Sequence, residues 1–195
     1  MAKKPRRPAY AQDHYYHLYN RGASRVSIFQ EDDNYYFVLG RIKSYCREFK
    51  ITPISYCLMP NHYHFLVRQD GEQPAGLLVQ RVFNSYSKAY NKRYGHSGTL
   101  FQGPYKVIEI TKESHLRHLC RYIHANPVKD GLVRNLEDWP YSNYHEYVGL
   151  RNGNLYDPAF VADIFGTSAE YQEFVVDYLI TRDIPVELVN YLEEV

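Results

Sequence analysis

His62 and His64, two histidines separated by one residue, are the side chains in this sequence whose spacing best suits metal binding. They fall in a β-rich run over residues 62–68, and alternate residues of a strand point to the same face. Both imidazoles would therefore project together, while Tyr63 would project to the opposite face. Such a pair can bind one divalent ion and leave positions open for other ligands. The alternative is a pair of buried, hydrogen-bonded histidines, because the chain contains nine histidines in all.

A predicted helix starting at Thr111 carries the second group of candidates. His118, Tyr122 and Asn126 follow one another at intervals of four residues and so share one helical face. The amide oxygen of Asn126 is a candidate third metal ligand, and His118 is a candidate auxiliary group. The spacing alone does not single out Tyr122, because 21 tyrosines are present and most tyrosines are packed rings with a bonded hydroxyl.

The elements that must position these side chains follow the order β-α-β-β-α-β-α. Helices interspersed with an antiparallel hairpin, whose turn is predicted at Pro60 and Asn61, indicate an α+β fold with helices packed on a sheet. Thr111 is expected to cap the last helix, and Pro127 is expected to end it, since proline disfavours a helical residue before it. The predicted strands cover residues 14–20, 51–58, 62–68 and 105–110, and the predicted helices cover residues 31–49, 75–93 and 111–126.

The net charge of +1 conceals three segments of different sign. Residues 1–80 carry a balance of +4, residues 81–134 carry +7, and residues 135–195 carry −10. A basic body with an acidic end is typical of a polyanion-binding protein, although ordinary solvated surfaces give the same balance. We expect three parts, which are a basic arm over residues 1–13, one domain over residues 14–149 and an acidic helical extension over residues 150–195.

Composition argues against a membrane-spanning or secreted protein. No apolar run approaches the roughly 20 residues that a spanning helix needs, and the basic N-terminus lacks the apolar stretch of a secretory signal. The three cysteines, Cys46, Cys57 and Cys120, form no CxxC pair, which predicts reduced, buried thiols. We therefore expect a cytoplasmic protein.

Four blocks of sequence, in order, resemble one known family. They are YHLYNRG at 16–22, CLMPNHYHFLV at 57–67, GTLFQGPYKV at 98–107 and RYIHANPVKDGLV at 121–133. The second block resembles the histidine–hydrophobic–histidine motif of the HUH single-strand endonucleases. The whole set resembles the REP-associated tyrosine transposases, which are similar to the insertion-sequence-200 group. The resemblance covers residues 14–149 and implies a ferredoxin-like HUH fold with an antiparallel sheet.

The resemblance also implies an enzyme that nicks and joins single-stranded hairpin DNA of the REP, or palindromic, type. Tyr122 matches the family's nucleophile, which retains the 5′ end of the DNA as a phosphotyrosine. His62, His64 and Asn126 match its metal ligands, with Mg²⁺ or Mn²⁺ as the ion. The family further favours a monomer that uses its tyrosine in cis, with a dimer as the alternative, in the bacterial cytoplasm in association with the nucleoid.

Basic side chains near these blocks are the candidate DNA contacts. Tyrosines and cations alternate over residues 85–96, which is typical of stacking on unpaired bases, although an amphipathic helix gives the same pattern. Pro104 stands where the family commonly has an arginine, so Lys106 would have to supply that contact. The candidates are Lys88, Lys92, Arg93, Lys106, Arg117, Arg121 and Lys129.

Two other functions stay open on the sequence. One is a catalytically silent binder of structured DNA that derives from a transposase. The other is a metal-dependent hydrolase that works without a covalent step. Trapping of a protein–DNA adduct separates the covalent enzyme from both.

Overall fold

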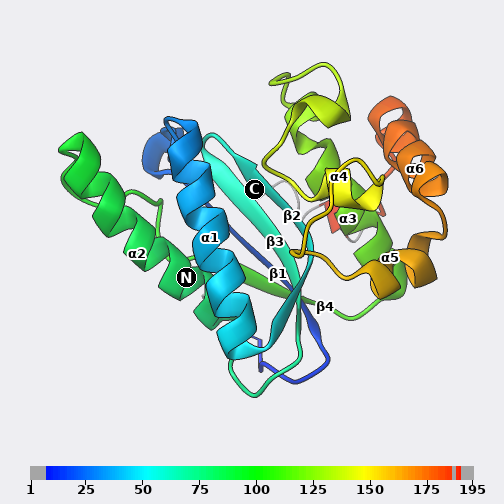
Figure 1. The fold of residues 1–195 in the computed structure, drawn as a ribbon, viewed down its shortest axis with the longest axis horizontal. Coiled ribbons are helices and arrows are strands. Elements are labelled where there is room, and N and C mark those ends of the chain that lie inside the picture. Colours follow the sequence, from blue (N-terminus) through cyan, green and yellow to red (C-terminus); the bar gives the residue numbers. More distant parts are fainter. Residues whose placement is uncertain (1–7, 186–187, 190–195) are drawn as a thin grey trace, which may run out of the picture.

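A four-stranded antiparallel sheet is the frame of the protein (Figure 1). The structure is a computed structural model in which residues 8–185 and 188–189 are described, so parts of the basic arm and of the acidic extension lie outside it. The strand order is β2-β3-β1-β4. The strands are β1 (Tyr15–Arg21), β2 (Ile51–Met59), β3 (His62–Gln69) and β4 (Lys106–Ile110).

Helices cover both faces of this sheet. The helices α1 (Asp32–Phe49) and α2 (Gly76–Tyr94) pack against each other on one face. The helix α3 (Glu113–Lys129) lies on the other face, mainly over β2. The β-α-β-β-α-β order with this strand order is the ferredoxin-like arrangement, so the predicted α+β class and the predicted order of elements are confirmed.

Side-chain alternation along β3 explains why the sheet has two different faces. Tyr63, Phe65 and Val67 belong to the apolar cluster beneath α1 and α2. Leu66 belongs to the second cluster, together with the apolar side chains of α3. Because residues alternate between faces along a strand, His62 and His64 lie on the α3 face with Leu66.

The helix α3 differs from the prediction at both ends. It begins at Glu113 after Lys112, so Thr111 is not its cap, and Lys112 makes no capping side-chain bond. It also continues through Pro127 to Lys129 instead of ending at Asn126. Proline forfeits only one backbone donor, and this part of the helix is buried, so tertiary packing outweighs the local preference.

The acidic extension packs onto α3 and forms part of the core. A short helix α4 (Tyr144–Tyr147) is followed by α5 (Pro158–Phe165) and α6 (Ser168–Thr181), all on the α3 side of the sheet (Figure 1). Two short 3-10 helices, η1 (Ala23–Arg25) and η2 (Leu136–Asp138), complete the described elements. No helix in the described part of the chain has the length and apolarity that crossing a membrane requires.

Candidate active site

His62 and His64 lie at the start of β3 and project to the same face of the sheet. Their imidazole rings are perpendicular, and the ring centroids are 5.1 Å apart. Tyr63 points to the opposite face, where its ring stacks on Phe83 with a centroid distance of 3.9 Å. The strand therefore presents the two imidazoles as a pair, as its alternation predicted.

Each of these two imidazoles has its Nδ1 atom engaged. His62 Nδ1 lies 2.7 Å from Oδ1 of Asn61, and His64 Nδ1 lies 2.9 Å from Nε2 of His17. His64 Nε2 is buried and has no hydrogen-bond partner among the described residues. A buried polar atom is normally bonded, so this nitrogen fits a metal ligand.

Burial keeps both imidazoles neutral. Burial, together with the positive charges of Lys129 and Arg21, lowers the pKa of His62 to about 4. Burial also lowers the pKa of His64 well below its ordinary value, with His17, His62 and Lys129 adding to the effect. A neutral imidazole has the lone pair that metal coordination requires.

Tyr122 lies beside this histidine pair. Its ring meets that of His64 edge to face, with a centroid distance of 5.7 Å. The side chain is only 4% exposed, and burial raises the pKa of its phenol above the ordinary value. At neutral pH the hydroxyl is therefore protonated, and it must lose its proton if it is to act as a nucleophile.

Asn126 follows Tyr122 by one helical turn and is also buried. Its Nδ2 donates to the carbonyl oxygen of Tyr122 at 3.0 Å, which fixes the amide group within the helix. No three His, Cys, Asp or Glu side chains of the described residues are arranged to hold one ion. A third protein ligand from that part of the chain would therefore be of another type, such as the amide oxygen of Asn126.

Lys129 reaches the site because α3 continues past Pro127. It lies two helical turns after Tyr122, and its Nζ sits 4.4 Å from the centroid of the Tyr122 ring. Burial lowers the pKa of this ammonium group. A cation so close to a buried phenol stabilises negative charge on the phenol oxygen more than it would in bulk water.

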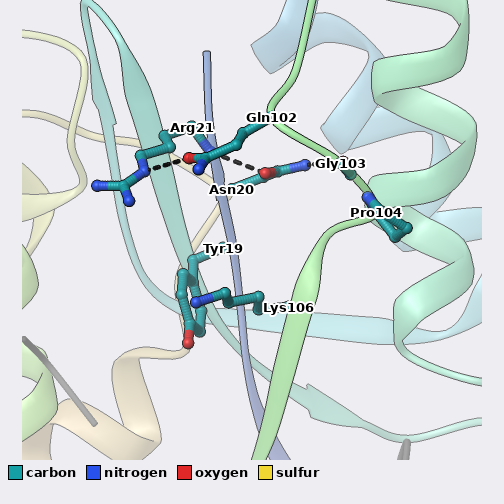
Figure 2. A pocket seen from close by; sticks show the side chains of 7 residues that line it. All are labelled: Tyr19, Asn20, Arg21, Gln102, Gly103, Pro104 and Lys106. Carbon is teal, nitrogen blue, oxygen red and sulfur yellow. Dashed lines mark hydrogen bonds between the residues drawn. The ribbon is translucent and has the colours of Figure 1, made fainter. Parts of the chain in front are cut away.

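A cavity of about 290 Å³ opens next to the histidines, at the end of β1 (Figure 2). Tyr19 connects the cavity with the histidines, because its ring lines the cavity and stacks on His17 at a centroid distance of 4.9 Å. Lys106 Nζ lies 5.7 Å from the Tyr19 ring centroid, and Arg21 Nε donates to Gln102 Oε1 at 2.6 Å. The remaining lining residues are Asn20, Gly103 and Pro104.

The cavity thus carries two cations, Arg21 and Lys106 (Figure 2). Both lie on the face of the sheet that carries the histidines, because Arg21 is paired with His62, and Tyr19 is paired with both His64 and Lys106. Pro104, which stands in place of the arginine common in the resembling family, lies on its wall. Lys106 is exposed there, so the structure brings this predicted DNA contact to the cavity. Two cations around a hollow beside a candidate metal site suit a phosphate and its nucleotide.

The structure packs Arg117 and Arg121, two of the predicted DNA contacts, against the C-terminal helices. Arg121 is 2% exposed, and its guanidinium lies 4.4 Å from the ring centroid of Phe174 and 5.1 Å from that of Tyr178. Arg117 donates to the carbonyl oxygen of Ile164. Both arginines therefore attach α5 and α6 to α3, where Arg121 is buried and Arg117 is half-buried.

His118 is also directed toward the extension. Its Nδ1 accepts from Arg121 Nη2 at 2.7 Å, and its ring centroid is 6.1 Å from that of Phe174. The sequence predicts an auxiliary part for His118 because it shares a helical face with Tyr122. That face contacts the histidine pair at Tyr122 and contacts α6 one turn earlier, where His118 lies.

Lys88, Lys92 and Arg93 lie on α2, across the sheet from the histidines. Lys88 and Lys92 are exposed, whereas Arg93 forms ion pairs with Glu31 at 2.9 Å and Asp33 at 3.2 Å. These three cations are thus not part of the site around Tyr122. A DNA strand would have to pass over the edge of the sheet to contact both these cations and the site around Tyr122.

The sequence-based set omitted three residues of the site, His17, Tyr19 and Arg21. They alternate along β1 and so share one face of that strand. The signal was present in the spacing, but the neighbour of β1 in the sheet was unknown. Only the pairing of β1 with β3, which sets Tyr19 opposite His64, brings these side chains to the histidine pair.

The model of the family described as "Transposase IS200 like" matches residues 10–126, which is more than half of the chain. The protein therefore belongs to the IS200-like transposase family. The match includes the histidine pair, Tyr122 and Asn126. It confirms the resemblance drawn from the four sequence blocks.

Individual relatives point the same way. The chain is 26% identical over 117 residues to a Haemophilus influenzae protein named for the REP-associated tyrosine transposases, and 27% identical over 127 residues to the REP-associated tyrosine transposase of Escherichia coli. The alignments cover 54% and 63% of this chain, and 66% and 69% of those relatives. A solved REP-associated tyrosine transposase bound to a REP hairpin superposes with a TM-score of 0.61 at 20% identity, over 79% of this chain and 94% of that one. That superposition supports the fold described above.

Proposed function

We propose that the protein is a metal-dependent single-strand DNA endonuclease and strand transferase that forms a 5′-phosphotyrosine intermediate. One observation carries the proposal. The Tyr122 ring lies 5.7 Å from the ring of His64, whose buried Nε2 has no partner among the described residues. A candidate nucleophile and a candidate metal ligand are thus neighbours in one buried site.

His62 and His64, with Asn126 as a third ligand, would hold the ion. Mg²⁺ or Mn²⁺ suits this set better than a closed zinc site, because two imidazoles and an amide leave positions for phosphate oxygens. When bound, such an ion polarises a phosphodiester and stabilises the charge that develops on its oxygens. The neutral state of both imidazoles supports this assignment.

Tyr122 supplies the covalent step. Its hydroxyl oxygen attacks the phosphorus and loses its proton, the bond from phosphorus to the 3′ oxygen breaks, and that oxygen leaves as a 3′-hydroxyl. The 5′ end stays on the protein as a phosphotyrosine. Attack by another 3′-hydroxyl reverses the sequence and joins two strands, which is the advantage of a covalent intermediate. Lys129, 4.4 Å from the Tyr122 ring centroid, stabilises the phenol oxygen as its proton leaves.

The cavity at Arg21 and Lys106 would seat the DNA next to the scissile phosphate. Its lining includes Tyr19 and the two cations, which lie on the histidine side of the sheet. A single strand fits such a site better than a duplex, because His64 and Tyr122 are buried and His62 is half-buried. The solved relative was bound to a REP hairpin, and we propose hairpin DNA as the substrate class here as well.

We also propose that one chain supplies the whole site and acts as a monomer in cis. Tyr122 on α3 and His64 on β3 of the same chain already lie in ring contact. A tyrosine supplied by a second copy would require α3 to leave its packed position. Mixing a Tyr122→Phe chain with a His64→Ala chain tests this, since restored cleavage would require exchange of α3 between copies.

The decisive experiment is to trap the covalent adduct. The protein is incubated with a single-stranded hairpin oligonucleotide and Mn²⁺, and the products are separated on a denaturing gel. An adduct that carries only a 3′-labelled strand supports the 5′-phosphotyrosine. Cleavage without an adduct would indicate a hydrolase, and binding without cleavage would indicate a catalytically silent DNA-binding protein.

Substitution of the histidine pair should remove metal-dependent cleavage. We expect His62→Ala and His64→Ala each to lower the cleavage rate by about 100-fold or more, because each removes an ion ligand. Tyr63→Phe should cleave normally, because Tyr63 packs on Phe83 at the other face of the sheet. Cleavage rates at saturating Mn²⁺ provide the measurement. An equal loss of cleavage in all three variants would show that any substitution destabilises the β2–β3 hairpin, and that the two histidines have no specific role as ligands.

Lys129→Met should slow adduct formation without releasing the DNA. The substitution keeps the length of the side chain but removes the charge beside the Tyr122 ring, and we expect a rate loss on the order of 10- to 100-fold. Single-turnover rates, with DNA affinity measured in parallel, separate the two effects. Lys43→Met, at an exposed position on α1, is the control. A Lys129→Met protein that forms the adduct at the normal rate would exclude this role.

A further inference from the structure

His17 is a fully buried histidine that the chemistry above does not use. It lies on β1, and its Nε2 is 2.9 Å from Nδ1 of His64. The two rings are nearly parallel, with an interplanar angle of 8° and a centroid distance of 5.1 Å. Two neutral imidazoles that share one hydrogen bond must differ in role, because one donates the proton and the other accepts it.

The position of that proton decides whether His64 can bind an ion. If His17 donated, the single ring proton of His64 would lie on Nε2, and this nitrogen would be a buried donor without a partner among the described residues. An unpaired buried N–H is rare and costly. If His64 Nδ1 donates to His17 Nε2, the His64 Nε2 atom carries a lone pair instead. The second arrangement is the one that suits a metal ligand.

His62 shows the same arrangement with a different partner. Its Nδ1 lies 2.7 Å from Oδ1 of Asn61, and an amide oxygen can only accept, so His62 Nδ1 carries the proton. Its Nε2 is thereby the nitrogen with the lone pair. The two histidines of the pair thus present equivalent atoms, although one is held by an amide and the other by an imidazole.

His17 itself is not placed as a third ligand. Its Nε2 is used by His64, and the described residues contain no group of three His, Cys, Asp or Glu side chains that could hold one ion. Its ring is nearly coplanar with that of His64 and joined to it edge to edge by the hydrogen bond, while Tyr19 stacks on His17, so the His64 ring is held in one orientation. A second partner that fixes the tautomer and orientation of a ligating histidine is a common feature of metal sites.

We propose that His17 is a positioning residue that holds the proton of His64 on Nδ1 and directs His64 Nε2 toward the ion. The role rests on the proposed metal site. A positioning role requires a hydrogen-bond acceptor at the position of His17 Nε2, whereas a packing role requires only a ring of similar size. Two substitutions distinguish the two roles.

His17→Phe keeps a flat ring of similar size but removes the acceptor. His17→Gln removes the ring but offers an amide oxygen near the same position. The measured quantity is the affinity of the DNA-free protein for Mn²⁺, obtained from the electron paramagnetic resonance signal of the unbound ion. We expect His17→Phe to weaken Mn²⁺ binding about 10- to 100-fold and His17→Gln to restore most of it. Thermal melting without metal checks that both variants fold.

Nitrogen-15 NMR of the histidine rings gives a second readout that needs neither metal nor activity. We expect His64 to carry its proton on Nδ1 in the unchanged protein and in His17→Gln, and to lose this single tautomer in His17→Phe. Normal Mn²⁺ binding and an unchanged tautomer in His17→Phe would overturn the role of His17 alone. No Mn²⁺ binding by the unchanged protein would overturn the metal site, and the role of His17 with it.

Discussion

Replacing Tyr122 by phenylalanine is expected to abolish DNA cleavage and the covalent adduct while DNA binding stays close to that of the unchanged protein. The substitution removes only the hydroxyl group. The ring keeps its edge against His64 and its place beneath the Lys129 ammonium group. Loss of a nucleophile in other covalent enzymes lowers the rate on the order of 10⁴-fold or more, and a loss of that size is expected here.

The label on the DNA makes this experiment specific. A 5′-phosphotyrosine retains the strand downstream of the cut, so an oligonucleotide labelled at its 3′ end should shift with the protein, and one labelled at its 5′ end should not. Tyr105→Phe and Tyr141→Phe are the matched controls. The Tyr105 hydroxyl lies 3.4 Å from that of Tyr10, and Tyr141 stacks on Tyr35 at a centroid distance of 3.7 Å. Normal cleavage by Tyr122→Phe would remove Tyr122 from the mechanism and direct attention to these two.

Much of the fold was predictable because its signals are local. Alternation along residues 62–68 and the turn at Pro60 and Asn61 specify a hairpin, and the structure has that hairpin in the predicted place. The periodic helices over residues 32–49 and 76–94 also match the prediction to within one or two residues. Strand order has no such local signal. The central position of β1, between β3 and β4, depends on which surfaces pack together.

In the candidate site, too, the local features were predictable from the sequence and the tertiary ones were not. His62 and His64 share a face because a strand alternates, and Tyr122 and Asn126 share one because a helix repeats. The placement of α3 over that face of the sheet is a tertiary feature that the sequence blocks implied only through family resemblance. Lys129 illustrates the difference, since the local effect of Pro127 predicted a helix that ends before it, whereas the buried helix continues.

The surroundings of Arg121 could not be predicted for the same physical reason. A basic residue beside the candidate nucleophile was expected at a phosphate, but the sequence gives no sign that α6 covers it. In the fold its guanidinium lies over Phe174 and Tyr178, and its Nη2 donates to the carbonyl oxygen of Asp183. An acidic, aromatic-rich extension can engage such a cation in place of DNA. Net charge along the chain could not distinguish these partners.

The acidic extension admits two physical roles, and the structure favours the structural one. Electrostatic shielding would need its carboxylates close to the cations of the site. Asp177 and Asp183 lie 3.7 Å and 3.8 Å from the Arg121 guanidinium, and both are more than half exposed. Because both carboxylates are exposed, although Arg121 is buried, water and salt screen these two pairs and they contribute little to stability.

The aromatic side chains of the extension are much more deeply engaged. Phe165 and Tyr171 are buried with a ring-centroid distance of 4.6 Å, and the Tyr171 hydroxyl lies 2.6 Å from Nδ1 of the buried His124 on α3. Burial of one such side chain contributes about 1.5–3 kcal/mol. The apolar side chains that the extension buries include Phe160, Val161, Phe165, Tyr171, Val175 and Tyr178.

Removal of residues 151–195 should therefore destabilise the protein severely. The lost burial is comparable with the whole free energy of unfolding of a typical domain, about 5–15 kcal/mol. We expect the melting temperature to fall by more than about 10 °C, if the shortened chain folds at all. Thermal and urea unfolding followed by circular dichroism provide the measurement.

The double substitution Asp177→Asn and Asp183→Asn is the matched test of shielding, since it removes the charges and keeps the packing. We expect its melting temperature and the salt dependence of its single-strand DNA binding to stay close to those of the unchanged protein. A shielding role would instead appear as tighter DNA binding at low salt, where the Debye length is longest. If the shortened chain melted normally and the double variant bound DNA more tightly, the extension would be an electrostatic cover and the structural role would be wrong. If the shortened chain were strongly destabilised and the double variant bound DNA normally, α5 and α6 would be identified as the packing that holds α3, and with it Tyr122, against the sheet.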